Sequence, residues 1–245
     1  MGDVVEIELA SLRAWPAPET ASVCGWLFRS AGGYTKRANS ANAIEPTGSF
    51  RDVKESAENF YKARGIAPTF RLSPLAPKDA DSELDEAGYI YRDPSVVLSM
   101  PVASSEIPSQ VRIATLPGRS WLDGYATANR LSPDYRVAHE KIVRSISGTT
   151  GFATLFEDDT PIGFGLAVQE ADLVGLFDIV VLPDYRGHGY GKVMTNALAS
   201  WGQGVGAKTA YLQVMQNNFI ARRLYHNLGF QEVYRYHYRC AGASR

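Results

Sequence analysis

A glycine-bearing segment in the C-terminal half of the chain has the residue types and spacing of a phosphate-binding loop. Residues 181–192 read VLPDYRGHGYGK, which contains the pattern Arg186-x-x-Gly189-x-Gly191. Glycines let a ligand approach the backbone without obstruction by side chains. A helix that begins in this loop would direct its unpaired N–H groups and the positive end of its dipole at that ligand. We therefore predict that the loop binds a phosphate group.

The spacing of this loop differs from two well-known phosphate-binding patterns. A dinucleotide fingerprint has the form Gly-x-Gly-x-x-Gly, with an acidic residue about twenty positions later. Here the third glycine comes one residue early, and residues 209–211 are Thr, Ala and Tyr. A nucleoside-triphosphate loop needs Ser or Thr after Gly-Lys, whereas Gly191-Lys192 is followed by Val193. The sequence disfavours both alternatives.

The elements around the loop can be predicted from apolar periodicity and turn residues. Three apolar runs joined by short polar turns precede the loop, which indicates an antiparallel meander. Apolar side chains at three- and four-residue spacing mark the helices; one begins at Ser132-Pro133, and the last ends at Gly229. The predicted order is β-α-α-β-β-β-loop-α-β-α-β, with strands near residues 111–115, 150–156, 162–168, 173–181, 209–215 and 230–239.

A second motif follows the loop at a fixed distance. It reads Asn218-x-x-Ala221-x-x-Leu224-Tyr225-x-x-x-Gly229-Phe230. Together with the loop pattern, it resembles the GNAT superfamily of acyl-CoA-dependent N-acetyltransferases, whose pyrophosphate loop is Arg/Gln-x-x-Gly-x-Gly/Ala. The resemblance covers roughly residues 110–240. It implies an α/β fold with a mixed, mostly antiparallel central sheet, in which two strands splay apart and helices flank the sheet.

The resemblance also implies a co-substrate, acetyl-CoA, and the residues that bind it. The pantetheine arm would pair with the backbone of the strand before the loop, and the pyrophosphate would rest on loop amides. Asn218 would contact the arm, and Tyr225 would lie near the thioester sulfur and protonate the departing thiolate. The cofactor-binding residues expected in this way are Ile179, Val180, Val181, Arg186, Gly187, His188, Gly189, Tyr190, Gly191, Lys192, Asn218 and Tyr225. No metal site is expected.

The base that accepts the proton of the attacking amine is a separate question. An alkyl amine with pKa ~10.4 is neutral only about once per thousand molecules near pH ~7.4, so some group should take its proton. Asp178 interrupts an apolar run before the loop, and a carboxylate there needs a partner or a purpose. It could act as the base, or it could be a structural carboxylate that caps backbone or pairs with an arginine. His237, in a final strand with Tyr and Arg on alternate sides, and water are the other candidates, while His139 and His226 are expected at the surface.

The N-terminal region carries helix and strand signals of its own. The segment with Tyr61 and Gly65-Ile66 echoes Tyr225 and Gly229-Phe230, which indicates either a degenerate GNAT-like half or chance similarity at a helix-to-strand corner. Because no Arg-x-x-Gly-x-Gly pattern precedes residue 180, we expect a single acetyl-CoA site, with the N-terminal part shaping the acceptor pocket or an interface. The predicted division is residues 1–100, a linker at 101–110, and the acetyltransferase domain at 111–240.

Composition limits the class of protein and its partners. The 245 residues include 25 basic and 26 acidic side chains, so we expect no broad electropositive face that could bind nucleic acid. There is no signal-peptide pattern and no apolar run long enough for a bilayer, which favours a cytoplasmic protein that does not bind membranes. Two distant cysteines are expected to be free thiols.

The sequence therefore predicts an enzyme that transfers an acetyl group to a primary amine by direct attack in a ternary complex. The acceptor could be a small molecule or a peptide. A non-catalytic acyl-CoA-binding or regulatory module is the alternative. Neither the acceptor nor the oligomeric state can be read from the residues.

Overall fold

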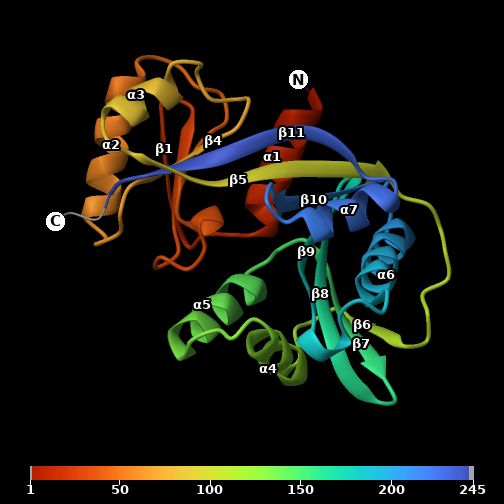
Figure 1. Ribbon diagram of the computed structural model, residues 1–245. Coiled ribbons are helices and arrows are strands. Elements are labelled where there is room, and N and C mark those ends of the chain that lie inside the picture. The colour runs from red at the N-terminus through yellow and green to blue at the C-terminus, as the bar shows by residue number, and fades with distance from the viewer. Residues whose placement is uncertain (1, 243–245) are drawn as a thin grey trace. The chain divides into compact units, whose positions relative to one another are not determined.

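The computed structural model describes residues 2–242, which form two compact units (Figure 1). The first unit comprises residues 2–97, 215–217 and 233–242, and the second comprises Leu98–Val214 and Asn218–Glu232. The chain therefore passes between the units more than once, and each unit has its own core.

The first unit is built on a sheet with the strand order β1-β2-β3-β4-β11. The strands β1, β2 and β3 are antiparallel neighbours, β4 runs parallel to β3, and β11 is antiparallel to β4. Its elements are α1 (Gly2–Ala14), β1 (Glu19–Val23), β2 (Trp26–Ser30), a 3-10 turn (Lys36–Ala38), β3 (Ala41–Ala43), α2 (Phe50–Lys62), β4 (Thr69–Leu72), α3 (Ala80–Glu86) and the start of β5 (Ile90–Pro101).

The core of the first unit forms where α2 and α3 cover the sheet. Phe50, Val53, Ala57 and Tyr61 make the buried stripe of α2, at the spacing that places side chains on one helical face. They pack in one cluster with aromatic side chains of β2 and β4, including Trp26 and Phe70. One of the helices expected in the N-terminal region is therefore present as α2.

The part of the chain from residue 111 onward contains the predicted order of elements. They are β6 (Val111–Ala114), α4 (Arg119–Ala128), α5 (Pro133–Arg144), β7 (Thr149–Glu157), β8 (Thr160–Glu170), β9 (Leu173–Val181), a 3-10 turn (Pro183–Tyr185), α6 (Tyr190–Gly204), β10 (Thr209–Met215), α7 (Phe219–Asn227) and β11 (Gln231–Cys240). The strand order is β10-β9-β8-β7-β6, and the β7-β8-β9 meander is antiparallel. The mixed α/β fold with a largely antiparallel sheet is thus confirmed.

Small residues let helices approach both faces of this sheet. A Cβ at Gly124 of α4 would overlap the ring of Phe164 on β8. A Cβ at the next position of the strand, Gly165, would lie 2.8 Å from Leu198 of α6. Successive side chains of a strand point to opposite faces, so α4 and α6 cover opposite sides of β8, as Figure 1 shows.

The two halves of the chain repeat one order of elements. Three antiparallel strands, a helix, a parallel strand, a second helix and a final strand occur as β1-β2-β3-α2-β4-α3-β5 and again as β7-β8-β9-α6-β10-α7-β11. The echo at Tyr61 and Tyr225 is not part of this repeat, because Tyr61 lies in α2 and Tyr225 in α7, which are not equivalent helices; it is a local similarity between two helix ends. The N–H of Ile66 donates to Tyr61 O, and that of Phe230 to Tyr225 O, each over 3.1 Å, after glycines with φ of 65° and 98°.

The two compact units do not have the boundaries of the predicted segments, and they differ at the strands β5 and β11. Residues 98–101 of β5 belong to the second unit, whereas residues 233–240 of β11 belong to the first, because β11 pairs with β4. Tyr234, Tyr236 and Tyr238 are buried on one side of β11, as the alternation predicts. Arg239 on the other side is also buried, since it bonds with Asp81 and Asp85 of α3.

Candidate functional site

The strands β9 and β10 separate where the resemblance places the cofactor. Their parallel pairing covers only residues 173–176 of β9 and 209–212 of β10. Beyond that point β9 keeps its partner β8, with Val180 opposite Phe164 and Val181 opposite Gly163. The edge of β9 that faced β10 is therefore open along Ile179, Val180 and Val181, whose side chains are half-buried.

The loop between β9 and α6 owes its shape to two glycines. Gly187 and Gly189 both have φ of 84°, the left-handed region that costs other residues energy. A Cβ at either position would meet no atom within 4 Å, so the need for glycine comes from the backbone conformation rather than from crowding. Gly189 is also the N-cap residue of α6.

Five consecutive amides of this loop are available to a ligand. No acceptor among the described residues takes a hydrogen bond from the N–H groups of residues 187–191. The flanking amides are used internally, since Arg186 N donates to Pro183 O and Lys192 N to Gly189 O. The group that can hold an anion is thus narrower than the predicted span from Arg186 to Lys192.

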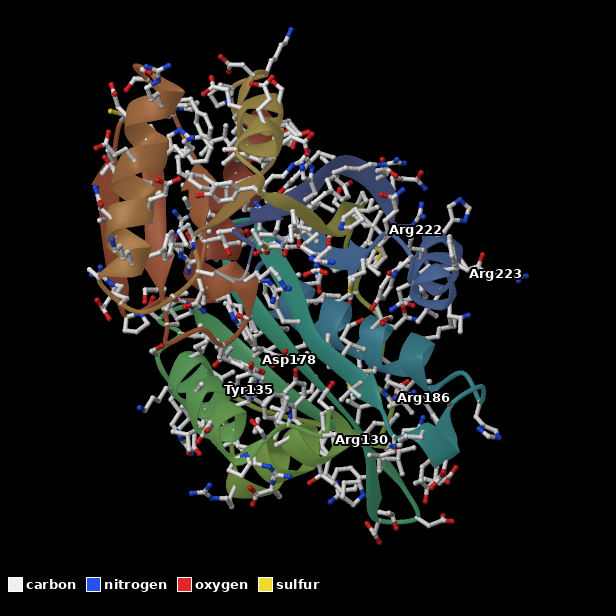
Figure 2. The ribbon with its side chains drawn as sticks, turned by 60° about the vertical axis from the view of Figure 1, so that its left-hand side comes forward. Arg130, Tyr135, Asp178, Arg186, Arg222 and Arg223 are labelled. Carbon is white, nitrogen blue, oxygen red and sulfur yellow. The ribbon has the colours of Figure 1, made fainter. Side chains whose placement is uncertain are left out.

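The polar side chains of the loop have partners within the protein. The Arg186 guanidinium (Figure 2) donates through Nε to Val181 O over 3.0 Å, and Tyr190 OH donates to Glu157. His188 is exposed, with Nδ1 3.4 Å from Tyr185 O, and Lys192 is exposed as well. The loop therefore offers backbone donors, while Arg186 secures the loop to the end of β9.

Helix α7, which carries Tyr225, packs against the start of α6. A Cβ at Gly191 would lie 3.1 Å from the Leu224 side chain, so the first turn of α6 packs closely against α7. Asn218 is the N-cap of α7, and its Oδ1 accepts from Ala221 N over 3.1 Å. Of the motif residues, Asn218 thus caps the start of α7, and Tyr225 lies on the buried face of the same short helix.

Tyr225 is buried and carries an uncommitted hydroxyl. Its side chain packs against Phe230, with ring centroids 5.8 Å apart. Within residues 2–242 its hydroxyl has no hydrogen-bond partner. Burial raises the pKa of Tyr225 to about 12, because the charged phenolate would lose its hydration. The phenol is therefore a protonated donor at neutral pH.

Asp178 lies at a bulge of β9 and is not paired with an arginine. Its φ is 53°, and the β8–β9 register shifts between Phe164 and Leu166 beside it. Its Oδ1 accepts from Tyr125 OH over 2.9 Å, and its Oδ2 lies 2.7 Å from His139 Nε2. Only 7% of the Asp178 side chain and 1% of the His139 side chain are exposed.

The expectation that His139 is a surface residue was wrong. His139 lies on the buried face of α5 with Ile142 and Val143, three and four residues further along. That spacing was visible in the sequence and could have placed the imidazole inward. Tyr125 lies on the buried face of α4, but its bond with Asp178 joins residues 53 positions apart, which no local pattern reveals.

His237, the second candidate for the base, lies in the first unit. Its Nε2 is 2.8 Å from Asp81 Oδ1, and its ring stacks on Tyr91 with centroids 4.5 Å apart. Asp81 also accepts from Arg239, and these bonds lower the pKa of Asp81, with the bond from Arg239 the largest cause. His237 is thus part of an ion-pair cluster that joins β11 to α3.

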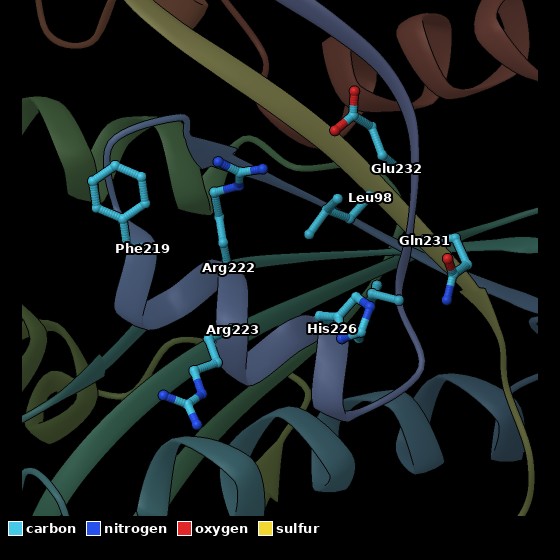
Figure 3. Close-up of a pocket in the computed structure, with 8 residues that line it drawn as sticks. Leu98, Phe219, Arg222, Arg223, His226, Gln231 and Glu232 are labelled. Atoms are coloured by element: carbon cyan, nitrogen blue, oxygen red, sulfur yellow. The ribbon is translucent and has the colours of Figure 1, made fainter.

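A pocket of about 540 Å³ is lined mainly by residues of α7 and of the segment that follows it (Figure 3). None of the predicted site residues lines it. Its lining consists of Leu98, Phe219, Arg222, Arg223, His226, Phe230, Gln231 and Glu232. The pocket therefore does not locate the candidate site, whose main donors are backbone amides.

Comparison with known proteins identifies the family. A family model described as the C-terminal part of the probable histone acetyltransferase Rv0428c matches residues 2–239. The chain belongs to this family of GNAT N-acetyltransferases. It is accordingly an acetyltransferase.

Relatives of this GNAT protein cover nearly the whole chain. An uncharacterized N-acetyltransferase, YobR of Bacillus subtilis, is 28% identical over 98% of this chain and 99% of its own length. The probable histone acetyltransferase Rv0428c of Mycobacterium tuberculosis is 26% identical over 96% of this chain and 71% of its own. A [ribosomal protein bS18]-alanine N-acetyltransferase of Haemophilus influenzae is 38% identical, over 32% of this chain and 53% of its own.

Solved structures share the fold of the GNAT protein at low identity. A GCN5-related N-acetyltransferase from Kribbella flavida has a TM-score of 0.72 at 16% identity, over 98% of this chain and 96% of its own. A tandem GNAT protein from the clavulanic acid biosynthesis pathway has a TM-score of 0.62 at 14% identity, over 98% of this chain and 89% of its own. Likenesses at this identity show the fold alone.

Two further properties concern the described residues only. Across residues 2–242, no helix of this GNAT protein is long and apolar enough to span a membrane. The same residues contain no cluster of three or more His, Cys, Asp or Glu side chains that could hold a metal ion.

Proposed function

We propose that this GNAT protein transfers the acetyl group of acetyl-CoA to a primary amine by direct attack in a ternary complex. The observation that carries the proposal is the run of five uncommitted amides at residues 187–191, at the start of α6 and next to the open edge of β9. Amides at a helix N-terminus bind phosphate oxygens, and an open strand edge can pair with the amides of a pantetheine arm.

The residues of the loop and of β9 would hold the donor. The N–H groups of residues 187–191 bind the pyrophosphate, while Arg186 and Lys192 contribute positive charge from the loop. The backbone of Ile179, Val180 and Val181 pairs with the pantetheine arm. Asn218 uses its Oδ1 to cap α7, which leaves its amide nitrogen as the donor for a cofactor contact.

Tyr225 would stabilise the leaving group. As the amine nitrogen forms a bond with the acetyl carbon, the carbon–sulfur bond breaks and CoA leaves as a thiolate. A thiol has a pKa of ~8.5, and burial raises the pKa of Tyr225 to about 12. The phenol therefore stabilises the thiolate chiefly by donating a hydrogen bond, and the sulfur takes its proton from the phenol or from water as the product leaves.

Asp178 would accept the proton that the amine loses. Its carboxylate lies on β9, in the strand that binds the pantetheine arm, and each of its oxygens accepts or shares a single hydrogen bond. A carboxylate oxygen can accept two, so a lone pair on each remains for an amine or a bridging water. His237 is already bound to Asp81, so we retain Asp178 as the base.

The first half of the chain would not bind a second donor. In its equivalent loop, between β3 and α2, three amides are occupied, because Ile44 N and Glu45 N donate to Gly25 O and Thr47 N donates to Cys24 O. Gly25 has φ of 72°, and a Cβ there would overlap Glu45 O. The turn between β1 and β2 thus lies against this loop and takes three of its amides, which supports a single acetyl-CoA site.

The acceptor in this proposal is defined only as a primary amine. The relative from Haemophilus influenzae is named for the alanine of a ribosomal protein, which would make a peptide N-terminus one acceptor class. That match covers 32% of this chain, so small-molecule amines belong in the same panel.

The test follows release of free CoA thiol from acetyl-CoA with a panel of peptide and small-molecule amines. Amine-dependent release is expected, and Tyr225→Phe should lower kcat by roughly a hundredfold while the Kd for acetyl-CoA stays within a few-fold. Tyr135→Phe, at an exposed tyrosine of α5, is the matched control and should act like the wild type.

Two outcomes would count against parts of this proposal. Unchanged release by Tyr225→Phe would remove the role of the phenol. Tight binding of acetyl-CoA with no release on any amine would favour the alternative, a non-catalytic acyl-CoA-binding or regulatory module.

A further inference from the structure

Asp178 is the centre of a buried cluster with two side chains that the reaction described so far does not use. Tyr125 of α4 and His139 of α5 bond with different oxygens of the carboxylate, over 2.9 and 2.7 Å. Three elements of the second unit thus converge on one carboxylate (Figure 2 labels Asp178 on its strand). Isolated burial of a carboxylate is unfavourable, so this cluster is a built environment rather than an accident of packing.

The rings of the cluster hold the imidazole in a fixed plane. Tyr125 stacks on His139 with centroids 4.4 Å apart and an angle of 16° between the planes, and Trp121 stacks on Tyr125 at 5.4 Å and 2°. The indole N–H of Trp121 donates to Ala153 O over 3.0 Å, which anchors the stack to β7. His139 therefore cannot turn away from Asp178 without disturbing the stack.

The backbone at Asp178 is strained at the same point. A φ of 53° is unusual for a residue other than glycine, and it coincides with the bulge of β9. Residues in sparsely populated backbone conformations cluster at active sites, although they also occur in turns. The bulge directs the carboxylate at α4 and α5, while the residues that follow in β9 keep their open edge.

From this geometry we propose that Tyr125, Asp178 and His139 form a proton-accepting relay for the acceptor amine. The inference rests on the proposed function and deepens it. Asp178 takes the amine proton as the nitrogen lone pair forms the new bond to the acetyl carbon and the sulfur leaves with its bonding electrons. Tyr125 and His139 are positioning residues: Tyr125 fixes Oδ1, and His139 shares the proton at Oδ2.

The charged groups around the relay are few. The carboxylate faces the phenol of Tyr125 and the imidazole of His139, and no other titratable side chain of the described residues bonds with it. Glu140 neighbours His139 along α5 and interacts with it electrostatically, but its hydrogen bonds are with Arg119 and Arg144, and its pKa is lowered chiefly by the bond with Arg144. The hydrogen bonds at the Asp178 carboxylate therefore come from Tyr125 and His139.

The first experiment measures kcat, KM and their pH dependence for His139→Gln and Tyr125→Phe, with His226→Gln at an exposed histidine as the control. Gln places an amide nitrogen near the position of Nε2, so it keeps a donor but cannot titrate. We expect His139→Gln to lower kcat by roughly 10–100-fold and to move the acidic limb of the pH profile, with KM for acetyl-CoA unchanged. A wild-type kcat and pH profile in His139→Gln would overturn the relay.

The second experiment does not need turnover. In 15N-histidine-labelled protein, the pH dependence of the His139 ring signals should change in Asp178→Asn, whereas those of His226 should not. Identical His139 curves in the wild type and Asp178→Asn would refute proton sharing even if the enzyme is active. Conversely, a wild type that releases no CoA thiol with any amine would contradict the proposed function, while the ring signals would still decide whether the pair exists.

Discussion

Replacement of Gly189 by Ala tests whether the amides of residues 187–191 bind acetyl-CoA. Its effect on the stability of the protein and its effect on the Kd for acetyl-CoA can be measured separately. Gly189 has φ of 84°, and a Cβ there would meet nothing within 4 Å, so the change adds strain without a clash. A left-handed conformation costs a residue with a Cβ about 1–2 kcal/mol, which should appear as lost stability. If the backbone relaxes to avoid that cost, the N–H of Tyr190 turns away from the ligand.

The expected loss of affinity follows from one amide. A hydrogen bond to a charged group contributes roughly 1.5–3 kcal/mol, so losing one from residues 187–191 should weaken acetyl-CoA binding about tenfold to a hundredfold. Isothermal titration calorimetry with acetyl-CoA measures the Kd, and urea unfolding measures the stability. Arg186 and Lys192 are unchanged in this variant, so the loss of affinity would not come from charge.

Two other glycines of α6 and its following turn give matched controls. Gly206 has φ of 106° and open space at its Cβ, so Gly206→Ala should lose similar stability but keep the wild-type Kd. Gly204 has open space and ends α6, so Gly204→Ala should be neutral or slightly stabilising. If Gly189→Ala binds acetyl-CoA as tightly as Gly206→Ala does, the reasoning that the loop amides hold the diphosphate is refuted.

Three further predictions concern packing and titration. Gly124→Ala should destabilise the protein by roughly 1–3 kcal/mol in urea unfolding, because its Cβ would overlap Phe164; a loss below that measured for Gly204→Ala would contradict the close approach of α4 to β8. Asp81→Asn should lower the free energy of unfolding by about 1 kcal/mol at neutral pH, because Asp81 is partly exposed. The difference from the wild type should shrink as the pH falls through the lowered pKa of Asp81, because protonation of the carboxylate weakens its bonds with Arg239 and His237 in the wild type as well. Burial raises the pKa of Tyr225 to about 12, so the folded protein keeps a proton that the unfolded chain releases near pH ~10. The stability of the wild type relative to Tyr225→Phe should therefore fall above pH ~10. A difference in stability that stays constant with pH would argue against a buried phenol.

Much of the second unit could be predicted because local residues fix its elements. Ser132 caps α5, with its hydroxyl accepting from Tyr135 N, and Gly229 ends α7 at a φ of 98°. Both signals act within a few residues, so the sequence alone carries them. The same holds for the loop, where Gly187 and Gly189 adopt the left-handed conformation that their type permits.

Contacts between distant residues explain what could not be predicted. Glu8 of α1 is buried because it bonds with Arg71 and Tyr234, which lie 63 and 226 positions away. The bond between Tyr125 and Asp178 has the same character, and so does the pairing of β11 with β4. A periodic pattern shows that a face is buried, but it does not show which polar partner makes the burial of a charge favourable.

The two halves show that the order of elements does not by itself create the candidate site. Both contain a helix that follows a meander, and in both the second helix ends at a glycine with positive φ, Gly88 after α3 and Gly229 after α7. They differ in the loop before that helix. In the second half none of the described residues accepts from the amides of residues 187–191. In the first half the turn at Cys24 and Gly25 lies against the loop, and its carbonyls accept from Ile44, Glu45 and Thr47. Because an amide already bonded in the protein gains little from a phosphate, binding should depend on how open this loop is and not on the order of elements alone.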